Sequence, residues 1–215
     1  MAGKRKVDNL LALAVLATVQ QRPMHRYEMA SIMRARDKDR DMNVKWGSLY
    51  TVVQNLEKHG FLENIGSSRQ GARPERTIYR ITDAGRRELV DWTRELISTP
   101  RPERPGFVAG LSVLAALPPH EATDLLRTRL GRLEETIGSR RAVLAEAAAD
   151  VPRLFLIEDE YELAMLEAEA SWVGSMIEEL ASGSHPDLAA WRSWHETGEM
   201  PAEMNELSER GAVPD

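Results

Sequence analysis

The sequence predicts a mainly α-helical protein with one small β-hairpin, divided into two parts by a proline-rich segment. Residues 49–56 carry apolar side chains at helical spacing, two short β-rich runs flank a glycine-containing loop within 61–82, and long helical patterns fill 118–182. We expect a helical domain with a hairpin over 1–98, a linker over 99–117, a helical hairpin over 118–182 and a partly flexible extension over 183–215.

The first helix is expected to begin after Asn9, whose side chain is a good N-cap for the apolar run that follows. The basic residues before it give this region some likeness to a secretory signal. The run is too short to span a bilayer, and Asp8 interrupts its approach, so we favour a core helix. Residues 23–33 predict a second, supporting helix.

The segment 45–60 predicts a helix that is apolar on one side and polar but mostly uncharged on the other. Leu49, Val52, Val53 and Leu56 recur at the spacing of a core-facing stripe, and Gly60 ends the pattern. The hydroxyls and carboxamides of the opposite side can donate to and accept from base edges in a major groove. This predicts a DNA-recognition helix; an ordinary amphipathic surface helix is the alternative.

A hairpin with a basic tip is expected after this helix, with strands at 61–65 and 76–82. The loop between them carries arginines on a flexible glycine- and serine-containing backbone, which suits phosphates or a narrow minor groove. Helix and hairpin together predict a winged helix-turn-helix domain, with a merely solvated hairpin as the alternative. The candidate DNA-binding residues are Lys4, Arg5, Lys6, Arg26, Lys45, Trp46, Ser48, Tyr50, Thr51, Gln54, Lys58, Arg69, Arg73 and Arg76.

Several short motifs in the first hundred residues resemble those of the PadR family of bacterial transcriptional regulators. They are Gly47-Ser48-Leu49-Tyr50, Leu56-Glu57, Gly60-Phe61-Leu62, the run Tyr79-Arg80-Ile81-Thr82-Asp83-Ala84-Gly85, and Leu89. The resemblance implies that Tyr50 belongs to the recognition helix and that many relatives are repressors released by small, often aromatic or drug-like molecules. This chain departs from the family at Arg26, where relatives often have a glycine before the tyrosine of the second helix. An arginine there could instead contact a phosphate.

Charge is distributed unevenly along the chain. Residues 1–100 hold 18 Lys and Arg against 12 Asp and Glu, whereas residues 101–215 hold 10 against 22, within a total net charge of −6. A basic first part joined to an acidic second part predicts a DNA-binding domain attached to one that does not touch DNA. Cysteine is absent, which excludes disulfides and is compatible with the cytoplasmic location we expect.

The second part predicts two long helices that form an antiparallel hairpin and a homodimer interface. Apolar residues of the first helix follow the steps of a heptad seam, and those of the second helix lie along one side. Packing within one chain is the alternative. The expected dimerisation residues are Leu126, Leu130, Leu133, Ile137, Leu144, Ile157, Tyr161, Met165, Trp172 and Met176.

No catalytic or metal-binding pattern is present, so the sequence predicts neither an enzyme nor a cofactor or metal, and no membrane partner. We expect a homodimeric, ligand-responsive repressor that binds double-stranded DNA at a palindromic promoter site. A protein-interaction adaptor whose winged domain no longer binds DNA is the alternative, and a ligand-binding or enzymatic second domain is a third interpretation. The expected effector pocket consists of Trp92, Tyr161, Met165, Trp172 and Met176.

Overall fold

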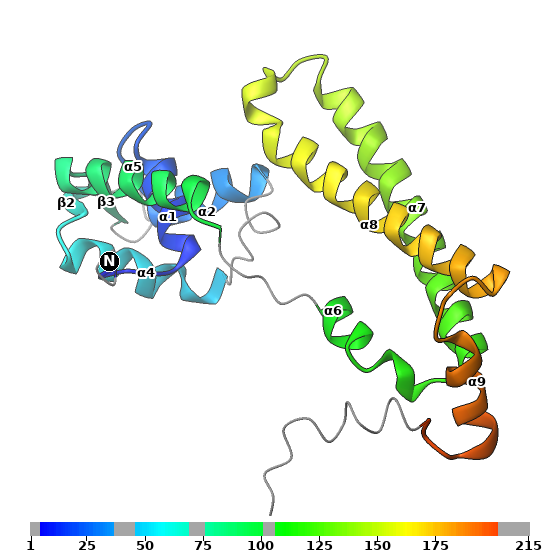
Figure 1. Cartoon of the computed structure of the whole chain (residues 1–215). Helices are drawn as coiled ribbons and strands as arrows, with labels where there is room; N and C mark the ends of the chain where they lie inside the picture. The colour runs from blue at the N-terminus through cyan, green and yellow to red at the C-terminus, as the bar shows by residue number, and fades with distance from the viewer. Residues whose placement is uncertain (1–4, 37–45, 69–75, 101–105, 202–215) are drawn as a thin grey trace, which may run out of the picture. The chain divides into compact units, whose positions relative to one another are not determined.

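The computed structural model describes residues 5–36, 46–68, 76–100 and 106–201 (Figure 1). The chain forms two compact units, Met1–Pro102 and Glu103–Asp215. The fold is mainly helical with one small antiparallel sheet, as the sequence predicts.

The first unit is built around α1 (Leu10–Val19), which packs against α2 (Arg26–Ala35), α4 (Leu49–Lys58) and α5 (Asp83–Ser98). A 3-10 turn, η1 (Trp46–Ser48), leads into α4. Six consecutive residues of α1, 11–16, are buried, so the helix is surrounded by its neighbours and has no polar face. The predicted cap is confirmed, because Asn9 Oδ1 accepts a hydrogen bond of 2.9 Å from the backbone N–H of Leu11.

A three-stranded sheet covers one edge of this helical core. It consists of β1 (Met24–His25), β2 (Leu62–Ser68) and β3 (Arg76–Ile81) in the order β1-β3-β2, with both pairs antiparallel. The sequence predicts residues 24–25 as part of the supporting helix, and this prediction is wrong. Two residues carry no strand periodicity of their own, and β1 exists because it pairs with β3, about fifty residues further along the chain.

The corner between β3 and α5 fixes the start of α5 against the end of α4. Thr82 caps α5 by accepting from the N–H of Gly85 at 3.0 Å, and its hydroxyl donates to the carbonyl of Gly60 at 2.6 Å. Gly60 has a φ of 74°, the left-handed conformation that ends a helix most easily with glycine. A Cβ on Gly85 would lie 2.2 Å from the carbonyl oxygen of Phe61, so only glycine fits there.

The second unit is dominated by an antiparallel hairpin of α7 (Pro119–Ala147) and α8 (Ile157–Ser182), joined through the 3-10 turn η3 (Arg153–Phe155) (Figure 1). The terminal helix α9 (Leu188–Thr197) packs on α7, and Trp191 Nε1 donates to the carbonyl of Leu117 at 2.9 Å. Helix α6 (Gly106–Leu111) and the turn η2 (Leu114–Ala116) occupy part of the expected linker. They are ordered because Phe107 and Leu114 pack against the core of the hairpin.

Among the helices that the structure describes, none is both long and apolar enough to cross a lipid bilayer.

Candidate nucleic-acid interface

Helix α4 has two chemically distinct sides, as its sequence predicts. Leu49, Val52, Val53 and Leu56 are buried with exposures of at most 9%, and they hold the helix against the core. On the opposite side, one set of polar residues is exposed: Thr51, Gln54, Asn55 and Lys58. Anchored by its apolar stripe, α4 presents these hydroxyl, carboxamide and ammonium groups on a rigid backbone. Such an arrangement can read base edges.

Two arginines of α2 stack on aromatic rings at the start of this helix. The guanidinium carbon of Arg26 lies 4.0 Å from the ring centre of Tyr50, and that of Arg34 lies 4.5 Å from the ring of Trp46. Tyr50 is 54% exposed. These contacts fall in the range of cation–π interactions and concentrate positive charge beside the start of α4. Arg34 was not among the predicted site residues, because its partner Trp46 lies twelve positions away and no local motif connects them.

Arg26 also lies near Tyr79 of β3, at 5.9 Å from its ring centre. Tyr79 is buried, and this burial raises the pKa of its phenol, while the charge of Arg26 acts in the opposite direction. The phenol therefore remains neutral at physiological pH, and Arg26 faces two uncharged rings.

The hairpin formed by β2 and β3 corresponds to the predicted wing. Its ladder shifts register between Asn64 and Ser67, where Gly66 has a φ of 130°. The predicted wing contacts Arg69 and Arg73 lie outside the described residues, as do Lys4 and Lys45. Arg76 begins β3, directly after the tip.

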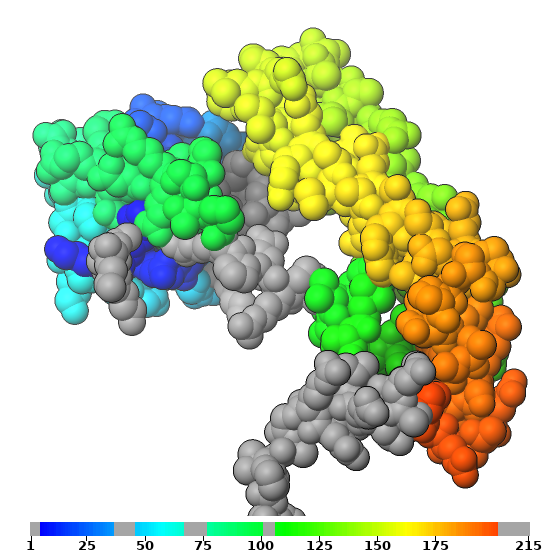
Figure 2. All heavy atoms as spheres, in the orientation of Figure 1, coloured from blue at the N-terminus to red at the C-terminus, as the bar shows by residue number. Residues whose placement is uncertain are grey.

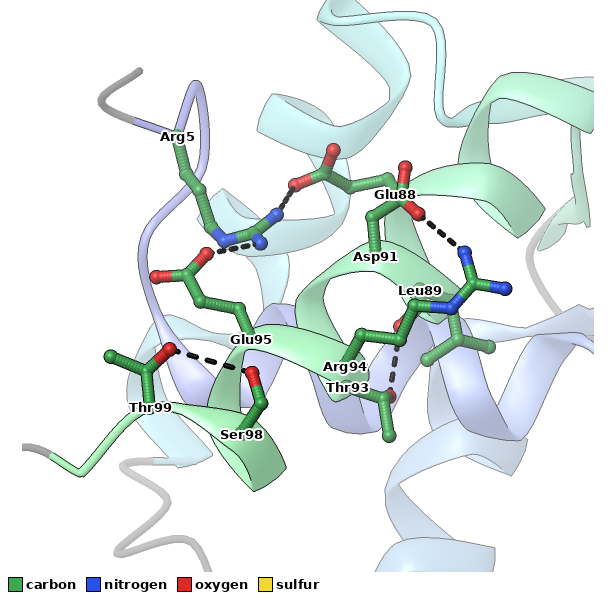
Figure 3. Close-up of polar contacts among 9 residues, drawn as sticks. All are labelled: Arg5, Glu88, Leu89, Asp91, Thr93, Arg94, Glu95, Ser98 and Thr99. Atoms are coloured by element: carbon green, nitrogen blue, oxygen red, sulfur yellow. Dashed lines mark hydrogen bonds and ion pairs between the residues drawn. The ribbon is translucent and has the colours of Figure 1, made fainter. Parts of the chain in front are cut away.

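Arg5 does not lie free for a DNA backbone, in contrast to the expectation from its sequence context. Its side chain is only 13% exposed and forms ion pairs with Glu88 and Glu95 of α5, the second at 2.5 Å (Figure 3). The guanidinium also lies 5.2 Å from the ring of Trp92. Burial disfavours the charge of Arg5, but the hydrogen bonds to both carboxylates outweigh this and raise its pKa. Arg5 thus ties the start of the chain to α5, whereas Lys6 next to it is exposed.

The predicted dimerisation residues separate into two groups. Leu126, Leu133 and Ile137 of α7 are between 4% and 8% exposed and pack in the same core as Val173 of α8. Leu130 and Met176 pack against that core, and Leu144 is half-buried. The heptad seam of α7 is therefore filled within one chain, which corrects its assignment to a subunit interface.

A row of residues on α8 remains uncovered. Ile157, Tyr161, Met165 and Trp172 are exposed by 51%, 65%, 52% and 44%, and their spacing of four, four and seven places them along one side of the helix. We call these four residues the α8 row. The open surface of α8 is visible in yellow and orange in the space-filling view (Figure 2).

The five expected effector residues do not form one pocket. Trp92 is 1% exposed and belongs to the core of the first unit, so it is not available to line a ligand site. Trp172 instead contacts Phe107 edge-on, with ring centres 6.1 Å apart. Tyr161 and Met165 do border a common hollow, an open groove of about 530 Å³. The groove is also lined by Thr136, Arg140, Glu162, Leu166, Ala168 and Glu169.

Fold and geometry together define a winged-helix protein with a separate helical-hairpin unit. Residues 15–91 match the model of the transcriptional regulator PadR-like family. Within this range, the chain is similar to the PadR-like transcriptional regulators.

Comparison with individual proteins gives the same similarity. The chain is 25% identical over 142 residues to the negative transcriptional regulator PadR of Bacillus subtilis (strain 168), an alignment that covers 64% of this chain and 77% of the relative.

Three solved structures share the fold. The crystal structure of Bacillus subtilis PadR in complex with operator DNA has a TM-score of 0.66 at 22% identity, and that of the same protein with p-coumaric acid has 0.65 at 20%. Each covers 80% of this chain and 99% of its own. The Vibrio cholerae virulence activator AphA has a TM-score of 0.58 at 16% identity and covers 80% of this chain and 98% of its own.

Proposed function

We propose that this protein is a sequence-specific DNA-binding regulator that represses transcription by occupying a palindromic promoter site as a homodimer. The observation that carries the proposal is the outer side of α4, where Thr51, Gln54 and Asn55 are exposed on a helix anchored by four buried apolar residues. The arginines stacked beside this face supply charge for phosphates, which position a protein on the duplex while base contacts specify the sequence.

A mobility-shift titration of the intact chain tests this directly. The probes are a labelled duplex from immediately upstream of the gene that encodes the chain and a shuffled duplex of the same length and composition. We expect tighter binding of the upstream duplex and a steep fall of affinity with salt, because bound phosphates release counterions. No binding of either duplex across the salt range would support the adaptor alternative instead.

The α8 row supports the homodimer. An exposed apolar stripe on a long helix is uncommon on a monomer and typical of an interface, and a second copy of the chain offers the same stripe in return. A dimer also presents two α4 helices to the two halves of a palindrome. The interface we propose consists of Ile157, Tyr161, Met165 and Trp172, not of the seam of α7.

Sedimentation of the intact chain and of Tyr161→Glu separates these possibilities. A glutamate in the centre of an apolar interface must be buried without a partner, so we expect Tyr161→Glu to be monomeric at concentrations where the parent chain is dimeric. Leu125→Glu is the matched control, because Leu125 is 52% exposed on α7 and outside the α8 row. A parent chain that is monomeric at micromolar concentration, yet binds tightly to its operator, would refute the dimer.

A second copy over the α8 row would also enclose the open groove beside Tyr161 and Met165. Its size is in the range of small-molecule sites, and it offers apolar surface for an aromatic ring. Arg140 also lines it and pairs with Glu162 at 3.5 Å, so an acidic effector would have to replace that carboxylate. We propose it as the effector site. The test is release of the labelled duplex by p-coumaric acid, with Thr136→Phe, which fills the groove from α7 outside the α8 row, as the variant expected to lose the response. A response retained in that variant would place any effector elsewhere.

A further inference from the structure

The contact between Arg26 and Tyr50 joins two parts of the first unit that the sequence treats separately. Arg26 is the first residue of α2, and Tyr50 is the second residue of α4. The separation of 4.0 Å between guanidinium carbon and ring centre is that of a close stack, and Tyr79 approaches the same guanidinium from β3. Three elements therefore fix the position of one cation.

The position of Arg26 on α2 is electrostatically unfavourable for the helix itself. The N-terminus of a helix carries partial positive charge, so a cation in the first turn opposes the helix dipole. The acidic residue of that turn, Glu28, pairs with Arg22 rather than with Arg26. Helix stability therefore does not explain an arginine at this place.

Stacking leaves the hydrogen-bonding capacity of the guanidinium intact. Its five N–H donors lie in the plane of the group, and a ring against one face blocks none of them. Arg26 is half-buried and forms no ion pair with any residue in the described part of the chain. Its charge is thus held in place by neutral rings, and no carboxylate among the described residues cancels it.

We propose that Arg26 and Tyr50 act as one phosphate-binding unit, in which the ring of Tyr50 holds the guanidinium of Arg26 so that its N–H edge engages a phosphate of the duplex. This rests on the proposed DNA-binding function and divides the roles of two candidate residues: Arg26 makes the contact and Tyr50 positions it. Arg26 touches the phosphate, and Tyr50 acts through Arg26. The consequence is that an uncharged side chain controls part of the salt dependence of binding.

The experiment measures the slope of log affinity against log salt for the intact chain on the upstream duplex described above. For Arg26→Gln we expect the slope to fall by about one unit, as for one lost phosphate contact. For Tyr50→Leu we expect a similar fall although no charge is removed, with an affinity loss of about ten- to a hundredfold, the range for a hydrogen bond to a charged group. The double variant should show no further change in slope, since both substitutions disable the same contact.

Two matched variants control for other roles of these side chains. Tyr50→Phe keeps the ring and should keep the slope of the parent chain. Arg94→Gln removes an exposed arginine of α5 that pairs with Asp91, and it should also leave the slope unchanged. Because Tyr50 is exposed, Tyr50→Leu should retain the thermal unfolding midpoint of the parent chain. Should it fail to fold, Arg26→Lys decides, because lysine keeps the charge but cannot stack as a plane, and its affinity should fall below that of the parent chain.

The outcomes separate this proposal from DNA binding itself. A parent chain without salt-dependent binding would remove the proposed function. Normal binding by the parent together with an unchanged slope in folded Tyr50→Leu would overturn only the stacked unit, as would an Arg26→Lys variant that binds like the parent.

Discussion

Replacing Arg5 by glutamine tests whether this residue belongs to the folded first unit or to its DNA surface. Exposed ion pairs contribute about 0.2–1 kcal/mol, and breaking a buried pair costs about 3–5 kcal/mol. The ion pairs of Arg5 lie between these two cases, because the Arg5 side chain is 13% exposed while those of Glu88 and Glu95 are each 23% exposed. We therefore expect a loss of about 1–3 kcal/mol, to which the lost packing of the arginine stem on Trp92 contributes. For a unit of roughly 100 residues, this lowers Tm by about 5–20 °C.

The assay is thermal unfolding of the intact chain by calorimetry, combined with DNA binding well below the transition. Lys6→Gln is the control, because Lys6 is the exposed neighbour of Arg5 and its replacement should leave Tm unchanged. Adding Glu88→Gln to Arg5→Gln should restore part of the lost Tm, since it removes the Glu88 carboxylate, which has lost its ion pair with Arg5. At low temperature, Arg5→Gln should bind DNA with the affinity of the parent chain.

The opposite pattern would refute this reasoning. An Arg5→Gln variant with unchanged Tm and a reduced salt slope of DNA binding would show that the ion pairs to α5 are dispensable and that Arg5 contacts phosphate, as its basic sequence context suggests.

Three further predictions concern the recognition helix, the wing and the corner before α5. Gln54→Ala should weaken binding of the upstream duplex by about 1–3 kcal/mol and leave shuffled DNA unaffected, and equal losses on both probes would exclude base readout. Replacing Arg69 and Arg73 by alanine should flatten the salt slope by about one to two units on both probes, whereas an unaltered slope would place the wing off the DNA. Gly85→Ala should lower Tm through a loss of about 1–3 kcal/mol, because its Cβ would meet a backbone carbonyl at 2.2 Å. A Cβ on Gly138 of α7 would meet open space, so Gly138→Ala should instead stabilise the chain by up to about 1 kcal/mol. A change of Tm in the same direction for both alanine variants would contradict the close-contact argument.

The elements that could be predicted from the sequence are those whose signals are local. The apolar stripe of α4, the caps by Asn9 and Thr82, and the left-handed Gly60 each depend on residues within one or two helical turns. Periodicity and capping chemistry are sufficient to predict such features, because the competing backbone conformations differ in free energy mainly through interactions between residues close in sequence.

The features that were missed depend on partners that are distant in sequence. A heptad seam shows that α7 packs on another helix, but it does not show whether that helix belongs to the same chain, and the structure places Leu133 against α8 of its own chain. The strand β1 and the helix α6 are likewise defined by tertiary contacts rather than by their own patterns. Arg5 looked like part of a basic arm because Glu88 and Glu95 lie more than eighty residues away.

The type of partner distinguishes the arginines that hold the fold from those available to a polyanion. A carboxylate neutralises the charge that it fixes, so Arg5 adds little to the field outside the first unit. An aromatic ring fixes a guanidinium without neutralising it, so the stacks of Arg26 on Tyr50 and of Arg34 on Trp46 reduce the mobility of each arginine without cancelling its charge. Binding a phosphate then requires less ordering of these side chains than of a free surface arginine, which reduces the entropic cost of association.

Both stacks lie where α2 meets the start of α4, so this preorganised charge adjoins the helix face that presents uncharged polar groups. That placement is what a DNA-binding surface requires, because phosphate contacts set the register in which the polar face can read bases.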